Sequence, residues 1–286
     1  PGDSRVYVNG QLDGVTEITA SDLSLTEDGD AVSRTESDWV VHPVSAVLET
    51  YTLLLIDVSD SVTQEGSLQV AQGVAVDFVE AVVEQGQLVS VAIFDGDPEL
   101  RSLIGFTTNL EDLTTAIDAI GPEDRIDGST NLNGAIIQAL AILDEQVGPD
   151  VEAELVSVAN LVVFTDGTDS AQRESDDAAR RAVNGSDHEV FVVGLVGDDD
   201  VEELEELGKT GFFQAADQGA LVDSFQELTD KLVAETNKFY RLSYCSPLRG
   251  PRTTLKVEVA WDDSQDTIDF TYETSGFGPG CQLPAE

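Results

Sequence analysis

The middle of the chain alternates two kinds of apolar pattern, and this alternation constrains the fold more than any other feature. Continuous apolar runs cover residues 51–56, 88–94, 161–164 and 190–195, as expected for strands buried on both faces. Between them, apolar residues recur three or four positions apart, as on one face of a helix. We therefore expect an α/β domain over residues 49–237, with a mostly parallel sheet and helices on both faces. The residues at helical spacing are Val70, Val74, Phe78 and Ala81; Ile117 and Ile120; Ile136, Ile137, Leu140 and Leu143; and Leu221, Phe225, Leu228 and Leu232.

The two ends of the chain, residues 1–48 and 238–286, instead contain short runs in which apolar and polar residues alternate. This pattern predicts strands that place one face against a core. The runs are separated by turn-forming residues, among them Asn9-Gly10 and Glu27-Asp28-Gly29. The apolar residues are Val6, Tyr7, Val8, Leu23, Leu25, Trp39, Val40, Val41, Tyr240, Leu242, Tyr244, Leu255, Val257, Val259, Trp261, Ile268, Phe270 and Tyr272.

Neither end is long enough to bury a two-sheet core by itself, and an isolated hairpin is marginal in water. Together the ends approach the roughly 100 residues of an immunoglobulin-like domain. We therefore expect residues 1–48 and 238–286 to fold together as one β-sandwich, with the α/β domain inserted between them. Two unrelated β-rich appendages remain the alternative.

The chain is strongly acidic, with 14 Lys and Arg against 56 Asp and Glu and a formal net charge of −42. Such a surface repels phosphate backbones and anionic headgroups, so nucleic acid and membrane surfaces are poor partners. Hydrophobic residues still make up 41% of the chain in patterned blocks, which argues against charge-driven disorder. The acidity suits both a saline habitat and simple solubility, and the sequence does not decide between them.

The two cysteines, Cys245 and Cys281, are expected to form a disulfide. Closing this loop would stabilise the fold by about 4 kcal/mol, because it lowers the chain entropy of the unfolded state. A disulfide implies an extracellular or cell-surface location, whereas two buried free thiols in a cytosolic protein are the alternative. The chain contains no methionine, which indicates a processed or trimmed form of a secreted or lipoprotein-derived protein. No stretch approaches the roughly 20 apolar residues of a membrane-spanning helix, so membrane insertion is not expected.

Oxygen-bearing side chains follow the predicted strands at the edge where α/β proteins bind ligands. Asp57, Ser59 and Ser61 follow the first apolar run, and Thr130 lies in a Gly-Ser-Thr-Asn segment before a predicted helix. Asp166 follows the run that begins at Leu161. Carboxylate and hydroxyl oxygens suit Mg²⁺, Mn²⁺ or Ca²⁺. Neither cysteine has the neighbouring Cys or His that a zinc site requires.

These residues, in this order, resemble a von Willebrand factor A domain with a metal-ion-dependent adhesion site, of the type found in secreted bacterial proteins. The family pattern of DxSxS, then Thr, then Asp is matched by Asp57, Ser59 and Ser61, then Thr130, then Asp166. The likeness covers residues 50–236 and implies a Rossmann-like fold. Ser129 departs from the pattern, because such domains often have glycine before the threonine.

The resemblance implies that Ser59 and Ser61 coordinate the ion directly, with Thr130 direct or through water. Asp57 and Asp166 would act largely through water and by hydrogen bonds to the hydroxyls. Neutral oxygens leave the positive charge of the ion poorly neutralised, so an acidic side chain of a protein partner can complete the coordination. The expected function is therefore adhesion or protein binding, without catalysis.

Three alternatives remain open. The same hydroxyl and carboxyl groups could simply cap helices. The chain could instead be a structural subunit of a surface assembly or filament that self-associates through its β-rich ends. A phosphatase with Asp57 as nucleophile is the third, although Ser59 stands where such enzymes have a second acid, and no Gly-x-Ser-x-Gly motif is present.

Other polar clusters carry weaker signals. Asp198-Asp199-Asp200 is expected to precede a helix, and Asp95-Gly96-Asp97-Pro98 to form a loop after a strand. Asp262-Asp263 is typical of a turn. His42 and His188 lack a recognisable catalytic setting, so a structural or exposed position is expected for both.

Overall fold

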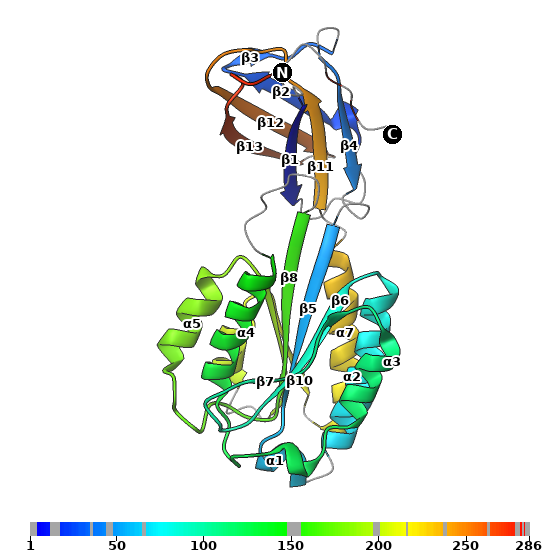
Figure 1. Cartoon of the computed structure of the whole chain (residues 1–286), viewed down its shortest axis with the longest axis vertical. Coiled ribbons are helices and arrows are strands. Elements are labelled where there is room, and N and C mark those ends of the chain that lie inside the picture. The colour runs from blue at the N-terminus through cyan, green and yellow to red at the C-terminus, as the bar shows by residue number, and fades with distance from the viewer. Residues whose placement is uncertain are drawn as a thin grey trace. The chain divides into compact units, whose positions relative to one another are not determined.

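The structure is a computed structural model. It describes residues 5–11, 18–34, 37–43, 48–64, 67–147, 156–196, 201–215, 217–236, 239–261, 264–277, 281 and 283. The chain divides into two compact units, an α/β unit over Leu48–Ala234 and a β unit made of Pro1–Val47 and Glu235–Glu286 (Figure 1). None of the described helices has the length and apolar character needed to cross a membrane.

The α/β unit contains a six-stranded sheet with strand order β10-β9-β8-β5-β6-β7. Its strands are parallel except for β7, which pairs antiparallel with β6. The four strands expected from apolar runs, β5, β6, β8 and β9, occupy the middle of this order. The strand bounds are β5 (Leu48–Asp57), β6 (Leu88–Phe94), β7 (Arg101–Thr107), β8 (Val156–Thr165), β9 (Glu189–Leu195) and β10 (Gly211–Ala215).

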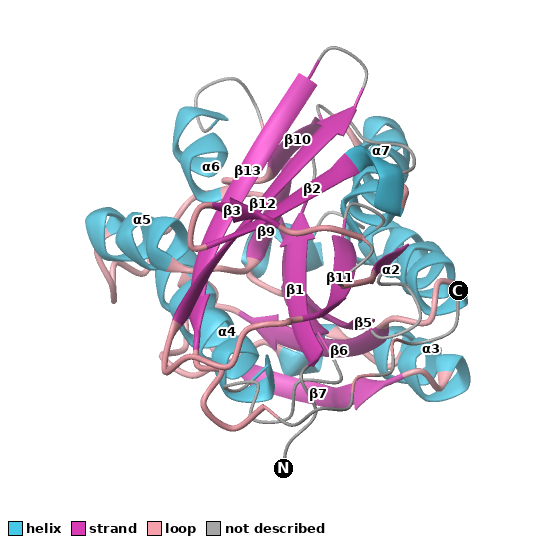
Figure 2. Ribbon diagram, turned by 90° about the horizontal axis from the view of Figure 1, so that it is seen from above, coloured by secondary structure: helices cyan, strands magenta, loops and turns pink. Residues whose placement is uncertain are grey.

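The long helices of this unit cover both faces of the sheet, as the sequence predicts. One apolar core lies between the sheet and α2, α3 and α7, and a second lies between the sheet and α4, α5 and α6. The two groups of helices lie on opposite sides of the sheet in Figures 1 and 2. The helix bounds are α1 (Asp60–Gln64), α2 (Ser67–Glu84), α3 (Leu110–Asp118), α4 (Leu132–Val147), α5 (Asp176–Gly185), α6 (Val201–Leu207) and α7 (Gln218–Thr236).

Strand β5 shows why a continuous apolar run specifies a central strand. Leu54 and Ile56 belong to the core beneath α2, α3 and α7, whereas Leu53 and Leu55 belong to the core beneath α4, α5 and α6. Successive side chains point to opposite faces of a strand, so a strand covered on both faces must be apolar at every position. All four side chains are at most 1% exposed.

The β unit consists of two antiparallel sheets, and each combines strands from both ends of the chain. The strand orders are β1-β11-β4 and β13-β12-β2-β3. The prediction that the two ends fold together is therefore confirmed. The strand bounds are β1 (Arg5–Gln11), β2 (Leu23–Glu27), β3 (Asp30–Ala31), β4 (Trp39–Pro43), β11 (Phe239–Cys245), β12 (Thr253–Trp261) and β13 (Ser264–Tyr272).

One apolar core joins the facing surfaces of these two sheets, as in a β-sandwich. The core residues of the three-stranded sheet are Val6, Val8, Trp39, Tyr240, Leu242 and Tyr244, and those of the four-stranded sheet are Leu23, Leu25, Leu255, Val257 and Val259. In β12, buried residues alternate with more exposed ones, which explains the period of two in the sequence.

Of the two turns predicted near the N-terminus, the structure contains one and not the other. Asp28 and Gly29, with φ of 51° and 93°, connect β2 and β3 as the sequence predicts, and both positive values suit a tight hairpin turn. The turn expected at Asn9-Gly10 is wrong, because β1 continues through both residues and pairs them with Arg241 and Tyr240 of β11. Pairing with β11 therefore overrides the local turn preference.

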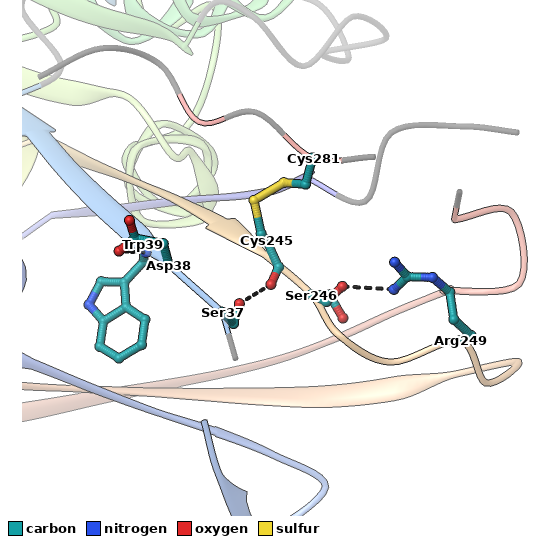
Figure 3. Close-up of a disulfide and its surroundings, with 7 residues drawn as sticks. All are labelled: Ser37, Asp38, Trp39, Cys245, Ser246, Arg249 and Cys281. Atoms are coloured by element: carbon teal, nitrogen blue, oxygen red, sulfur yellow. Dashed lines mark hydrogen bonds between the residues drawn. A yellow bond between two sulfur atoms is a disulfide. The ribbon is translucent and has the colours of Figure 1, made fainter. Parts of the chain in front are cut away.

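The expected disulfide between Cys245 and Cys281 is present, with the two Cα atoms 5.9 Å apart (Figure 3). It ties the end of β11 to the C-terminal segment of the chain. The carbonyl oxygen of Cys245 also accepts a hydrogen bond from the Ser37 hydroxyl, and the Ser246 carbonyl accepts one from the Arg249 guanidinium at 2.8 Å.

Candidate metal-binding site

The carboxyl ends of neighbouring parallel strands bring distant residues to one edge of the α/β sheet. Strand β5 ends at Asp57 and pairs with β8, with Ile56 opposite Phe164. Because β8 ends at Thr165, Asp166 emerges at the same edge. Open α/β sheets bind ligands at this position.

Asp57 is fully buried and fixed through both carboxylate oxygens. Oδ1 accepts a hydrogen bond from the backbone amide of Ser59 at 2.8 Å, and Oδ2 accepts one from the Thr165 hydroxyl at 2.7 Å. The first bond shapes the loop that follows β5, and the second joins that loop to the end of β8. Asp57 thus positions the loop that carries Ser59 and Ser61.

The two serines and Asp166 form a continuous chain of polar contacts. The Ser59 and Ser61 hydroxyl oxygens lie 3.3 Å apart, and the Ser61 hydroxyl donates to Asp166 Oδ1 at 2.7 Å. With Asp57 bonded to the amide of Ser59, four of the five predicted residues are linked through direct contacts. They come from two loops more than a hundred residues apart in sequence.

The segment that carries Thr130 bonds to both of these loops through its backbone. The amide of Asp60 donates to the carbonyl of Gly128 at 3.1 Å, and the amide of Thr130 donates to the Ser170 hydroxyl at 2.9 Å. Thr130 is 6% exposed. The structure thus places the Thr130 segment against both other loops.

Glycine at position 128 leaves room for the carboxylate of Asp60. A Cβ atom there would fall 2.5 Å from Asp60 Oδ2. Asp60, which lies between the two serines, instead directs its carboxylate to Arg125 at 2.7 Å.

The two predicted carboxylates repel each other at this edge. The pKa of Asp57 is raised to about 7, first by burial and second by the negative charge of Asp166, although hydrogen bonds from Ser59 and Thr165 oppose the rise. A buried carboxylate beside a second acid favours binding of either a proton or a cation.

The donor set fits a hard divalent cation. In an octahedral Mg²⁺ site with bonds of 2.0–2.1 Å, neighbouring ligand oxygens are about 3.0 Å apart. The 3.3 Å separation of the Ser59 and Ser61 oxygens is close to this spacing. Within the described ranges, no three His, Cys, Asp or Glu side chains form a metal-binding group, so a cation held here would need hydroxyl oxygens as well as carboxylates.

Ser129, which departs from the family pattern, has a local structural role. Its amide and hydroxyl both donate to Asp127 Oδ1, at 3.0 and 2.7 Å. These two bonds, followed by the ion pair with Arg173, lower the pKa of Asp127. The serine therefore stabilises the turn before Thr130, and Thr130 keeps its place beside the other two loops.

Asp95 is a structural residue of this edge whose role is not evident from the sequence pattern. Its buried carboxylate accepts backbone hydrogen bonds from Ile126 at 2.6 Å, Asp127 at 3.3 Å and Asp97 at 2.7 Å, and it pairs with Arg101 at 3.0 Å. The one sequence feature that could have indicated this role is the position of Asp95 directly after a buried strand. Two of its partners, Ile126 and Asp127, lie about thirty residues further along the chain, so the sequence pattern did not identify them.

We expect Asp95→Asn to lower the free energy of unfolding of the α/β unit by about 2 kcal/mol, because a charged acceptor of several hydrogen bonds becomes neutral. Urea unfolding followed by far-ultraviolet circular dichroism measures this change. Asp97→Asn is the matched control, since the new amide oxygen can still accept the hydrogen bond from the Glu99 backbone. Equal stability of the two variants would contradict this role of Asp95.

The structure describes only some of the other polar clusters that the sequence contains. Asp198-Asp199-Asp200 and Asp262-Asp263 lie outside the described residues, although α6 does begin at Val201. The Asp95-Gly96-Asp97-Pro98 segment forms the expected loop after β6. His188 is buried and bonds to Asp144 at 2.9 Å, which fits the structural role expected for it.

The family comparison agrees with this geometry. The family described as von Willebrand factor type A domain matches residues 53–229, which is more than half of the chain and nearly all of the α/β unit. The chain therefore belongs to this family. No curated protein sequence matches the chain.

Solved structures share the fold at low sequence identity. The conserved hypothetical protein BatB from Bacteroides thetaiotaomicron is 15% identical, with a TM-score of 0.50 over 65% of this chain and 98% of its own. The vWF domain of the type V pili tip protein Mfa5 from Porphyromonas gingivalis is 12% identical, with a TM-score of 0.52 over 66% and 96%. The pilus adhesin SpaC from Lactobacillus rhamnosus GG, in an open conformation, is 11% identical, with a TM-score of 0.52 over 87% and 47%.

Proposed function

We propose that the α/β unit binds a divalent cation through Asp57, Ser59, Ser61, Thr130 and Asp166 and uses it to bind a protein partner outside the cell. The observation that carries this proposal is the chain of contacts from Asp57 through the two serines to Asp166. Hard oxygen donors favour Mg²⁺, with Mn²⁺ and Ca²⁺ as alternatives. Membership in the von Willebrand factor type A family supports the same assignment.

The chemistry of the donors defines the partner. A bound cation supplies a positive charge that the neutral hydroxyls of Ser59, Ser61 and Thr130 do not cancel, so it attracts a carboxylate oxygen from another molecule. The partner is therefore a protein that presents an exposed Asp or Glu. The two similar pilus proteins and the disulfide are consistent with an extracellular or surface location.

A metal-dependent pull-down tests this function. In an extract of the native source, the wild-type chain should retain a partner in the presence of Mg²⁺ and release it on addition of chelator. Thr130→Ala should lose this binding and still unfold cooperatively. Thr115→Ala, which removes a hydroxyl exposed on α3, is the control and should bind like wild type. Capture that is equally strong with chelator would contradict the proposed function.

A second candidate is self-association through the β unit, and the edge strand β13 favours it. This strand pairs with β12 on one side and ends the described sheet on the other. Its Ile268 is 42% exposed and lines an apolar cavity of about 110 Å³ that Val8, Leu242 and Val257 also line. A long exposed edge strand is a template for pairing with another copy.

Mass measurement by light scattering at several protein concentrations separates the two candidates. Self-association through β13 should increase with concentration and be indifferent to chelator. A chain that stays monomeric at every concentration would contradict the second candidate and leave metal-dependent partner binding.

A further inference from the structure

The loop that follows Asp166 holds the main chain of Thr130 at both its amide and its carbonyl. The amide of Thr130 donates to the Ser170 hydroxyl at 2.9 Å. The carbonyl of Thr130 accepts from the amides of Ser170 and Ala171, both at 3.0 Å. Three hydrogen bonds therefore join one residue of the candidate metal site to a segment that the family motif does not include.

The same segment also holds the first turn of α4, directly after Thr130. Asp169 Oδ2 accepts a hydrogen bond from the amide of Asn133 at 3.0 Å, and its Oδ1 accepts one from the amide of Gln172 at 2.6 Å. Gln172 has a φ of 52°, a left-handed conformation that is uncommon for residues other than glycine. The loop is thus folded back on itself where it contacts the Thr130 segment.

These bonds fix the direction of the Thr130 side chain. The Cα–Cβ bond of a residue has a set direction once its amide and carbonyl are fixed, and only the side-chain rotamer remains free. The hydroxyl of Thr130 contributes to the metal site only if the backbone presents it toward Ser59 and Ser61. Metal sites depend on such supporting contacts for the orientation of their ligands.

We propose that Ser170 is a positioning residue of the metal site, whose hydroxyl fixes the Thr130 amide and thereby the orientation of the Thr130 side chain. This inference rests on the proposed function. Ser170 acts through Thr130 and does not itself touch the cation. Since Ser170 is exposed, removal of its hydroxyl creates no buried cavity, and the fold should survive.

Ser170→Ala tests the inference through two readouts. In the metal-free protein, hydrogen exchange of the Thr130 amide should accelerate about fivefold, as expected for loss of one hydrogen bond. In calorimetric titrations with Mg²⁺ and with Mn²⁺, the dissociation constant should rise about tenfold, because loss of a supporting contact typically weakens metal binding by 10–100-fold. Ser170→Thr retains a hydroxyl and should restore both values.

Ser175→Ala is the matched control. The Ser175 hydroxyl accepts a hydrogen bond from the amide of Ala178 at 3.2 Å and caps α5, so this variant loses the same kind of contact away from Thr130. It should bind both ions like wild type. Equal metal affinity in Ser170→Ala and wild type would overturn the inference alone. Absence of metal binding in wild type would overturn the proposed function, and the inference with it.

Discussion

Asp57→Asn will abolish stabilisation by Mg²⁺ while leaving the metal-free protein at least as stable as wild type at pH 8. At a Mg²⁺ concentration of 100 times the dissociation constant, binding should stabilise wild type by about 2.7 kcal/mol. The variant lacks the carboxylate charge and should lose this gain. One substitution should therefore remove the stabilisation by Mg²⁺ without lowering the stability of the metal-free protein.

The asparagine can keep the hydrogen bonds of Asp57. Its Oδ1 can accept from the amide of Ser59, and its side-chain amide can donate to the Thr165 hydroxyl. That hydroxyl already lies 2.9 Å from the carbonyl of Gly167 and can donate there instead. The substitution therefore removes a buried charge without leaving a buried polar group unpaired.

The pH dependence of metal-free wild type follows from the raised pKa of Asp57. The folded protein holds a proton up to about pH 7, whereas the ordinary carboxyl value is 3.8. A carboxyl group whose pKa is raised in the folded state contributes its full stabilisation at pH values below its pKa in the unfolded state. This contribution is lost as the pH rises to the pKa in the folded state. The stability of Asp57→Asn relative to wild type should thus increase between about pH 4 and pH 7.

Chemical unfolding of the full chain at pH 5 and pH 8, with and without Mg²⁺, measures both effects. Far-ultraviolet circular dichroism reports the α/β unit, which contains the long helices. A variant that Mg²⁺ still stabilises as much as wild type would contradict the role of Asp57. Strong destabilisation of the metal-free variant at pH 8 would show that the charge of Asp57 supports the fold.

Reduction of the Cys245–Cys281 disulfide will lower the free energy of unfolding of the β unit by about 4 kcal/mol. The bond closes a sequence separation of 36 residues, and its loss releases chain entropy in the unfolded state. The α/β unit contains no cysteine, so its unfolding should not change. This is the largest effect on stability that we expect from a single bond in the chain.

The two tryptophans, Trp39 and Trp261, both lie in the β unit, so their fluorescence follows that unit during unfolding. The double variant Cys245→Ser and Cys281→Ser should unfold like reduced wild type and be insensitive to reductant. A tryptophan transition that is unchanged by reductant in wild type would contradict the predicted contribution of the disulfide.

The sequence predicts the central strands well because burial on both faces leaves a continuous apolar run. The edge strands β7 and β10 were missed for the complementary physical reason. The residues of β7, RSLIGFT, are intermediate or exposed, and β10 has only five residues, so neither shows a clear run. A strand with one free edge and partial burial does not require a distinctive pattern.

The sequence also predicts only part of the candidate site. Asp57, Ser59, Ser61, Thr130 and Asp166 follow strands or precede a helix, and parallel strands bring such positions to one edge. The supporting contacts made by Thr165, Asp95 and Ser170 depend on how the loops fold against one another. A hydroxyl that accepts one backbone hydrogen bond leaves no periodic signal in a sequence.

Anomalous diffraction from crystals grown with Mn²⁺ tests the central claim most directly, because it locates the ion without reference to any partner. We predict one strong manganese peak bonded to the hydroxyl oxygens of Ser59 and Ser61, with Asp57, Thr130 and Asp166 around it. A peak elsewhere on the chain, or no peak at millimolar Mn²⁺, would contradict the proposed site.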